Sequence, residues 1–547
     1  MNTDTISLLD KHFDLAINAP DGIKRLREMI LALAMQGKLV PQDPKDHPAS
    51  ELLKEIEAEK KRLVKEGKIK EPKPLSPVKP EEVPYEVPEG WEWFMLGEII
   101  DVLDSQRKPV TKSDRKKGII PYYGASGIVD YVDDYIFNEK LVLIGEDGAK
   151  WGKGDKTAFI INGKTWVNNH AHVIRPNRNL TIDEYLVNVL IGYDLSQYIT
   201  GMTVPKLNQA RLVSIPIPLP PLAEQRRIVA KIDELMARAE ELERRRDARN
   251  EKRLAMHQAA IARLLDAGDA NASRSGRDFI FAHFGELYRT KENVAELRKA
   301  VLQLAVMGRL VPHDPQDKPA SELLKEIEAE KKRLVQEGKI KEPKPLPPIK
   351  PEEVPYQVPK GWEWVRLGDI GNTQTGTTPA TKDPDNYGDF IPFVGPGDIQ
   401  NSKINNSNTS LSKKGLDYAR LISKNSILMV CIGGSIGKHA VNSIDLTCNQ
   451  QINTVTPYLI SVVYLFYSMG ASFFQNAVID NAGGSATPII NKQKWSLIPL
   501  PLPPLAEQDR IVAKVDELMM LCDKLDKQID ERTAKESALL EAVAARV

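Results

Sequence analysis

The chain has 547 residues, of which 41% are hydrophobic and 27% charged, and its 75 basic residues balance its 75 acidic ones. This length exceeds what one hydrophobic core usually holds, so we expect two to four domains. No apolar run is long enough to span a membrane, the polar N-terminus is unlike a signal peptide, and the three cysteines lack metal-type spacing, which together favour a reducing, cytoplasmic setting. The zero net charge excludes a uniformly cationic surface but not a local patch that binds nucleic acid.

Most of the sequence occurs twice. Residues 50–64 recur without change as residues 321–335, and residues 222–236 recur with two differences as residues 505–519. The segments between the repeats share little. The repeat therefore predicts a constant frame that carries two different inserts. The inserts span about residues 94–212 and 365–495.

The first repeated piece is an apolar helix, expected over residues 23–40 and again over residues 294–311. Gly37 and Gly308 lie where each of these helices could stop. A short charged helix follows, for which Ser50 is a plausible N-cap. After it comes a proline-rich connector, residues 71–91, which cannot be a helix or a central strand and should run extended.

Two long segments without glycine or proline follow the inserts, at residues 222–267 and 505–547. Their apolar residues recur at alternating spacings of four and three, which predicts a coiled-coil seam. The matching seams favour pairing of the two helices with each other; the alternative is that each helix packs on its own globular domain. The seam residues are Ile228, Ile232, Leu235, Ala239 and Leu242, and Ile511, Val515, Leu518, Cys522 and Leu525.

The repeat is circular. The first long segment leads to His283 and Phe284, whose twins, His12 and Phe13, lie at the N-terminus. The continuation that the second long segment lacks at Val547 is thus found at the start of the chain. We expect a pseudo-twofold relation between the halves and neighbouring termini.

Both inserts alternate apolar and polar residues between glycines, which predicts mixed α/β domains with short strands. The first carries a basic run and the second is rich in amide and hydroxyl side chains, which suit phosphate contact and base reading respectively. A solvated loop and a hydrogen-bonded turn are the structural alternatives. The candidates in the first insert are Arg107, Lys108, Lys112, Arg115, Lys116, Lys117, Tyr122, Tyr123, Asn168, Asn169, His170 and His172. Those in the second are Thr375, Thr377, Thr378, Lys382, Ser435, Lys438, Asn449, Gln450, Gln451 and Asn453.

No catalytic constellation is present in the sequence. His170 and His172 would share one face of a strand, but no third ligand has convincing spacing for a metal. Residues 433–439 resemble a phosphate-binding loop but lack its first glycine and its final serine or threonine. We therefore expect neither an enzyme nor a metal site.

The motif PLPPLAEQ, followed by RRIVAK or DRIVAK and then DELM, occurs once after each insert, and each apolar helix closes on GKLV or GRLV. This arrangement resembles the specificity subunit of Type I restriction–modification systems. The resemblance implies an α+β fold in which two target recognition domains, each binding half of a bipartite asymmetric DNA site, are joined by two long antiparallel helices.

The resemblance also implies partners. These are double-stranded DNA, two modification subunits that carry S-adenosylmethionine and methylate adenine, and motor–nuclease restriction subunits that use ATP and Mg; this chain would hold no cofactor and do no chemistry. The alternative is a protein–protein scaffold on a coiled-coil strut that does not bind DNA. The expected divisions are residues 1–90 (frame), 91–213 (first recognition domain), 214–361 (central frame), 362–496 (second recognition domain) and 497–547 (second long helix).

Overall fold

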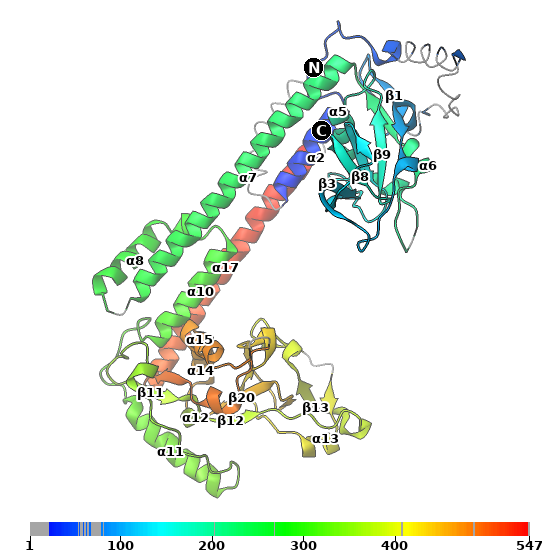
Figure 1. Ribbon diagram of the computed structural model, residues 1–547. Coiled ribbons are helices and arrows are strands. Elements are labelled where there is room, and N and C mark those ends of the chain that lie inside the picture. The colour runs from blue at the N-terminus through cyan, green and yellow to red at the C-terminus, as the bar shows by residue number, and fades with distance from the viewer. Residues whose placement is uncertain are drawn as a thin grey trace. The chain divides into compact units, whose positions relative to one another are not determined.

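The computed structural model describes residues 21–52, 54, 58, 62, 65–66, 78–79, 81, 83–201, 203–266, 268–405, 409–484 and 487–544. The chain forms two compact units, of which the first is Met1–Asn250 with Glu531–Val547 and the second is Glu251–Asp530 (Figure 1). Two long helices, α7 (Leu222–Leu265) and α17 (Leu505–Ala544), have the extents that the sequence predicts. Each unit holds one insert, the start of one long helix and the end of the other, and the fold is of the expected α+β class.

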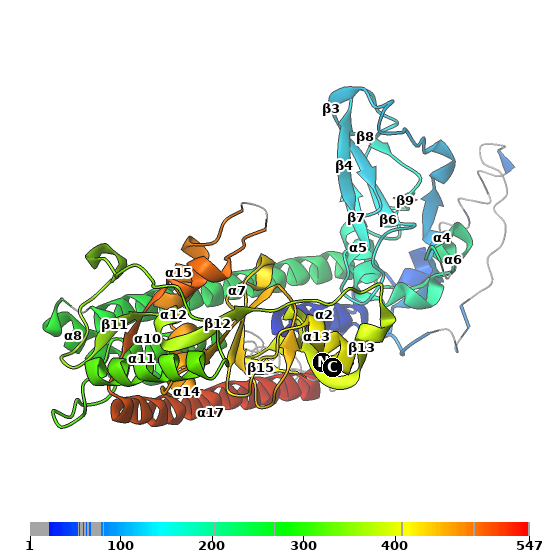
Figure 2. The same ribbon diagram turned by 90° about the horizontal axis from the view of Figure 1, so that it is seen from below.

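The insert of the first unit contains two four-stranded sheets (Figure 2). One has the antiparallel order β2-β9-β6-β7 and shares a core with α2 (Gly22–Met35) and α5 (Asp183–Gly192). The other has the order β4-β3-β8-β5, in which β3 and β8 run parallel. The strands are β2 (Ile100–Val102), β3 (Lys117–Gly124), β4 (Gly127–Val132), β5 (Phe137–Asn138), β6 (Leu141–Gly145), β7 (Ala158–Ile161), β8 (Lys164–Val167) and β9 (Ala171–Pro176).

The insert of the second unit repeats this plan. Its order β12-β20-β17-β18 corresponds strand by strand to β2-β9-β6-β7, and its order β16-β13-β19 again contains a parallel pair, β13 with β19. The two inserts therefore have the same sheet topology, although their sequences share little. The strands are β12 (Gly371–Thr375), β13 (Tyr387–Val394), β16 (Ser410–Leu411), β17 (Ile427–Val430), β18 (His439–Val441), β19 (Thr447–Cys448) and β20 (Ile452–Pro457), and the helices after them are α14 (Val462–Gly470) and α15 (Ser472–Asp480).

Buried hydrogen bonds fasten each insert to the frame at the start of its long helix. Trp91 donates its indole N–H to Glu224 Oε2 at 3.0 Å, and Trp362 donates to Glu507 Oε2 at the same distance. The neighbouring Gln225 accepts from the Ile182 backbone N–H at 2.9 Å, as Gln508 does from Ser461. The glutamate and glutamine of the repeated LAEQ motif are therefore structural ties.

Short two-stranded sheets close each insert beside these ties. β1 (Glu92–Met95) pairs with β10 (Pro216–Leu219), and β11 (Glu363–Arg366) pairs with β21 (Pro499–Leu502), in the same antiparallel register. The chain thus enters and leaves each insert at one place. This explains how one constant frame can hold two different inserts.

The apolar seams of the long helices are buried, as their spacing predicts. Ile228 packs in the same core as α2 in the first unit, while Ile511 packs with Val301 and Tyr464 in the second. Val301 belongs to α10 (Lys291–Val306), the twin of α2, and Tyr464 belongs to α14. The start of each seam therefore packs on the apolar helix and on its own insert. This packing agrees with the alternative prediction, in which each long helix packs on its own globular domain. Leu242, Leu518 and Leu525 are partly buried in these or the adjoining core.

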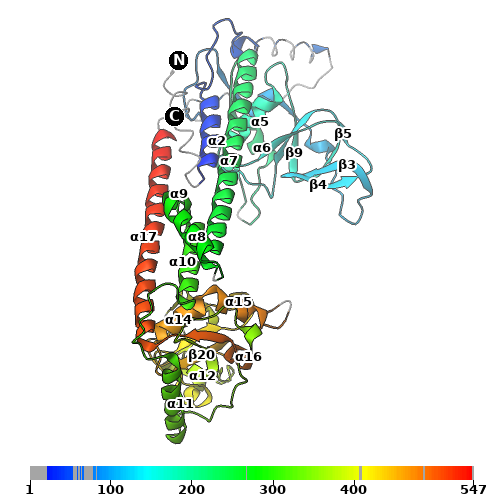
Figure 3. The same cartoon turned by 90° about the vertical axis from the view of Figure 1, so that its left-hand side faces the viewer.

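The end of each long helix lies in the unit where the other begins. In the second unit, α7 ends beside α8 (Ala270–Ala282), and Ala260 of α7 shares a core with Cys522 of α17. Figure 3 shows α10 beside α17, where Arg298 donates to Asp526 at 2.9 Å. In the first unit, Leu540 of α17 is buried in the core that contains α2 and the start of α7.

The circular repeat is visible within the first unit. Arg25 of α2 donates to Glu541 of α17 at 2.8 Å, so an early residue of the described chain contacts a late one. His12 and Phe13 themselves lie outside the described residues. Their twins, His283 and Phe284, link α8 to α10 in the second unit.

The boundaries of the frame helices follow local chemistry. Gly37 and Gly308 adopt φ values of 69° and 66° just beyond α2 and α10, as expected of a helix stop. The predicted N-cap role of Ser50 is wrong, because the helix already includes Ala49, whose N–H donates to the Gly90 carbonyl at 3.1 Å. Its twin α11 (Ala320–Gln336) begins in the same way, and residues 71–77, 80 and 82 of the first connector lie outside the described residues.

Among the described helices, no single one is long and apolar enough to cross a membrane, and α14 with α15 passes such a test only as a pair bent by 65°.

We predict that Leu540→Ala will lower the free energy of unfolding by about 2–5 kcal/mol, because it leaves a cavity in the core of the first unit. Its neighbour Leu539 is 43% exposed, so Leu539→Ala is the matched control and should change stability by less than about 0.5 kcal/mol. Urea denaturation of both variants measures this. Equal stabilities would contradict the packing of α17 in the first unit.

Candidate nucleic-acid interface

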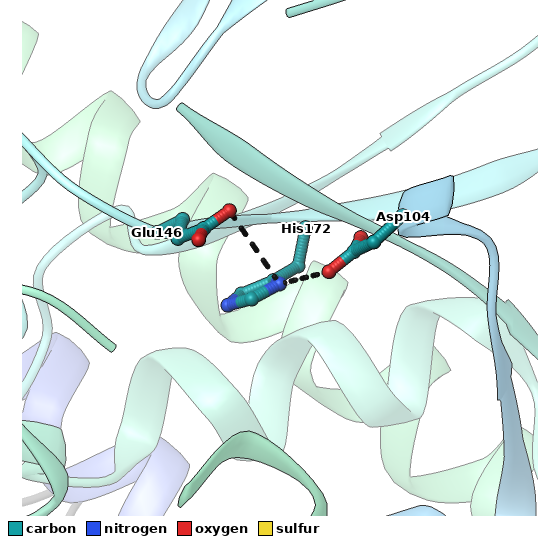
Figure 4. Close-up of side chains that lie close together, drawn as sticks. All are labelled: Asp104, Glu146 and His172. Atoms are coloured by element: carbon teal, nitrogen blue, oxygen red, sulfur yellow. Dashed lines mark hydrogen bonds and ion pairs between the residues drawn. The ribbon is translucent and has the colours of Figure 1, made fainter. Parts of the chain in front are cut away.

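A buried network of charged side chains lies at the base of the first insert (Figure 4). His172 Nδ1 lies 2.5 Å from Asp104 Oδ2, and its Nε2 lies 2.7 Å from the Leu207 carbonyl oxygen. Glu146 accepts hydrogen bonds from Arg107 and, at 2.8 Å, pairs with Lys206. His172 is fully buried, and Arg107 is only 12% exposed. These two residues hold the insert together, which corrects the prediction that they face DNA.

Asp104, Glu146 and His172 offer three ligand-type atoms within 4.8 Å of one another. The arrangement does not fit a metal. Glu146 already pairs with two cationic side chains, Arg107 and Lys206. Both ring nitrogens of His172 lie within hydrogen-bond distance of oxygen atoms, so the potential ligand atoms already have partners within the protein. The group is an internal ion-pair network.

The cations of this network control the acidity of Glu146. Burial alone would raise the pKa of its carboxyl, but the hydrogen bonds from Lys206 and Arg107 and the charge of His172 outweigh burial and hold the pKa below its ordinary value. The ionised form therefore contributes to folding.

Three further candidates of the first insert also turn inward. Tyr122 is 1% exposed, and its hydroxyl accepts from the Val110 N–H at 3.1 Å. Arg115 stacks over the Tyr122 ring at 4.4 Å and donates to Asp130 at 2.9 Å. Tyr123 is half-buried against Phe159. For Tyr122, burial contradicts a role at the surface.

The second insert has neutral side chains at the same places. Thr375 donates its hydroxyl to Asn453 Oδ1 at 2.7 Å. By strand register, this pair occupies the place in the second insert that Asp104 and His172 occupy in the first. Asn453 is 2% exposed, so its burial likewise contradicts the prediction that it contacts DNA. Cys431 occupies the place of Glu146. Glu146 donates its backbone N–H to the turn before β9, and Cys431 donates its backbone N–H to the turn before β20, both at 2.8 Å.

The structure brings the two polar segments of the second insert together. Thr377 N–H donates to the Cys448 carbonyl at 2.9 Å, and the Thr378 hydroxyl donates to Gln450. Gly376 makes this approach possible, because a Cβ there would lie 2.1 Å from the Asn449 carbonyl oxygen. Ser435 and Lys438 lie on a separate turn after β17.

The remaining candidates lie at or near the surface. In the first insert the exposed ones are Lys108, Lys112, Lys116, Lys117, Asn169 and His170; in the second they are Lys382, Lys438 and Gln450, with Thr377, Thr378, Ser435, Asn449 and Gln451 half-buried.

Sequence reasoning missed several residues. Asp104, Glu146 and Lys206 lie in three separate segments and carry no shared motif, and Arg420, which donates to the Thr375 carbonyl at 2.6 Å, is isolated in the sequence. These residues lie beside the predicted candidate residues only in the folded chain.

We predict that Arg107→Ala will lower the free energy of unfolding by about 2–4 kcal/mol, since it removes a partner of two buried carboxylates. The adjacent exposed Lys108 supplies the control, and Lys108→Ala should stay within about 0.5 kcal/mol of the parent chain. Urea denaturation distinguishes the two. An Arg107 variant of unchanged stability would return this residue to the set of candidate DNA contacts.

The network also predicts a pH effect. Because the folded-state pKa of Glu146 is lowered, its contribution to stability is complete above its ordinary pKa and is lost as the pH falls through the folded-state value. The stability difference between the parent chain and Glu146→Gln should therefore be largest near about pH 7 and shrink toward about pH 3. Unfolding midpoints across this range measure it, and a constant difference would refute the role of the carboxylate charge.

Comparisons with known proteins agree with the repeated architecture. A family model described as "Type I restriction modification DNA specificity domain" matches residues 88–250 and again residues 359–532. The chain is 34% identical over 565 residues to the Type I restriction enzyme EcoAI specificity subunit of Escherichia coli, with 95% of this chain and 92% of that protein covered. It is 31% identical over 566 residues to the EcoEI specificity subunit of the same species, with 95% and 93% covered.

Among solved structures, one chain of a type I restriction–modification system aligns with a TM-score of 0.46 at 19% identity, over 85% of this chain and 98% of that one. The family model and the two relatives cover both inserts and the frame together. The chain therefore belongs to the family of Type I restriction enzyme specificity subunits, the non-catalytic subunits that give these enzymes their DNA specificity.

Proposed function

We propose that this subunit binds a bipartite, asymmetric DNA site, reading one half-site with each insert, and that its repeated frame seats two modification subunits. The observation that carries the proposal is the contrast between the two inserts. They have the same strand order and the same ties to the frame, yet they differ in the polar side chains at their surfaces. One geometry with two surface chemistries suits two different half-sites.

The frame supports two equivalent docking sites because it presents the same residues twice. The ties Trp91–Glu224 and Trp362–Glu507, and the ion pairs Arg227–Asp46 and Arg510–Asp317, occur in both units. A frame held by the same contacts in both units would offer two equivalent surfaces, which suits two copies of one partner. In this proposal S-adenosylmethionine belongs to the modification subunits, and ATP and Mg belong to the motor–nuclease subunits.

DNA binding would divide between two kinds of side chain. Lys108, Lys112, Lys116 and Lys117 form an exposed basic segment in the first insert and would contact phosphates in a salt-dependent way. Lys382 and Arg420 offer similar cations on the second insert. The amide and imidazole groups have the hydrogen-bonding patterns that read base edges. A protein–protein scaffold without DNA binding is not favoured by the family to which the chain belongs.

We predict that replacing residues 94–212 with the corresponding insert of the EcoAI specificity subunit will change one half-site only, because the tie between Trp91 and Glu224 lies outside this segment. The other half-site and the gap between them should stay the same. Sequencing of methylated adenines in cells that carry the complete system measures this. The reciprocal control replaces residues 365–495 and should change the other half-site. A change in both half-sites, or in neither, would contradict the proposal.

A further inference from the structure

Each insert presents one turn in the same structural setting. The first turn, residues 168–170, follows β8, and the second, residues 449–451, follows β19. Asn168 N–H donates to the Tyr123 carbonyl and Asn449 N–H to the Val394 carbonyl, both at 3.1 Å. β8 and β19 are the strands that pair in parallel with β3 and β13. The two turns are therefore structural equivalents, although their sequences, NNH and NQQ, differ.

The first asparagine of each turn is an anchor. Asn168 Oδ1 accepts from the His170 N–H at 2.8 Å, and Asn449 Oδ1 accepts from the Gln451 N–H at 3.0 Å. Behind the turn, the carbonyls of His170 and Gln451 each accept a backbone N–H at 2.8 Å, from Glu146 and from Cys431. The backbone of both turns is thus fixed by the same three hydrogen bonds.

The other two side chains of each turn differ between the inserts and are open to solvent or half-buried. Asn169 and His170 are exposed in the first turn, Gln450 is exposed in the second, and Gln451 is half-buried. A fixed backbone with variable outward side chains is what reading of different bases requires, because a bidentate contact tolerates little displacement.

Neighbouring groups orient these side chains. His170 Nδ1 is hydrogen-bonded to Asp147, which sets the ring so that Nε2 is available to a base edge. Gln450 Oε1 accepts from Thr378, which leaves its amide N–H groups as donors. The two turns therefore offer different hydrogen-bonding patterns at the same position.

Cations lie close to both turns. The Lys108 carbonyl accepts from the indole of Trp166, in the strand that leads to the first turn, and this places Lys108 beside that strand. Arg420 is bonded to the Thr375 carbonyl, one residue before the glycine that touches the second turn. Phosphate contacts at these cations would hold a DNA backbone next to each turn.

We propose that Asn169 with His170, and Gln450 with Gln451, are the base-reading residues of the two half-sites, and that Asn168 and Asn449 are positioning residues that hold them. The proposal rests on the function proposed above and narrows it from whole inserts to two turns. It assigns the same role to residues at equivalent places in the two inserts. The exposed lysines of the first insert would contact phosphates and so bind DNA independently of its sequence.

The test converts the sequence of the first turn, NNH, to that of the second, NQQ. It uses the double variant Asn169→Gln, His170→Gln in the complete restriction–modification complex. Methylated adenines are mapped for the parent and the variant. The expected result is a changed base preference within one half-site, with the other half-site and the gap unchanged. A variant that methylates the parent site and no other overturns the proposal, whereas a parent complex without a bipartite site would instead refute the proposed function.

A binding measurement covers the outcome in which the variant methylates nothing. In the purified complex, Asn169→Ala with His170→Ala should reduce the preference for the parent site over single-base substitutions in its half-site by roughly 5- to 150-fold, the range expected for the loss of one bidentate base contact. Binding to unrelated DNA should not change. Lys112→Ala is the matched control: it should weaken binding to both DNAs alike and keep the preference. Equal preference in the alanine variant and the parent overturns the proposal.

Discussion

The hydrogen bond between a connector tryptophan and a buried glutamate at the start of a long helix is the constraint on which both halves of the molecule depend. Trp91 and Glu224 form it in the first unit, Trp362 and Glu507 in the second. All four residues are 5% exposed or less, so the carboxylate oxygen has lost its water and needs this donor. The next residue in each motif, Gln225 or Gln508, ties the same helix to the insert. Entry strand, exit strand and long helix are thereby held at one point.

Because the side chains of this fastening belong to the frame and meet the inserts at backbone N–H groups, the side chains inside the inserts could diverge as sets. Asp104, Glu146 and His172 in one insert correspond to Thr375, Cys431 and Asn453 in the other. Exchange of a single member would leave a buried charge or hydroxyl without its partner, which costs more than exchange of the whole group. The turns at residues 168–170 and 449–451 keep the same hydrogen bonds to their backbone in both inserts.

The sequence predicted those features that depend on local pattern. Both long helices and the helix stops at Gly37 and Gly308 follow from spacing and repetition. The candidate surface was harder to predict, because exposure depends on distant partners. Arg107 belongs to a basic run but turns inward to Glu146, 39 residues away, and His172 meets Asp104 at a separation of 68. Ser50 has the chemistry of an N-cap, yet the carbonyl of Gly90 takes that role from across the fold.

The central claim is that one frame presents two equivalent turns to two different half-sites. Site-specific photo-crosslinking from positions 169 and 450, in the assembled complex on its own DNA site, tests it most directly. The account predicts that position 169 crosslinks to bases of one half-site and position 450 to bases of the other. Crosslinks from both positions to the same half-site, or to the gap between the half-sites, would contradict it.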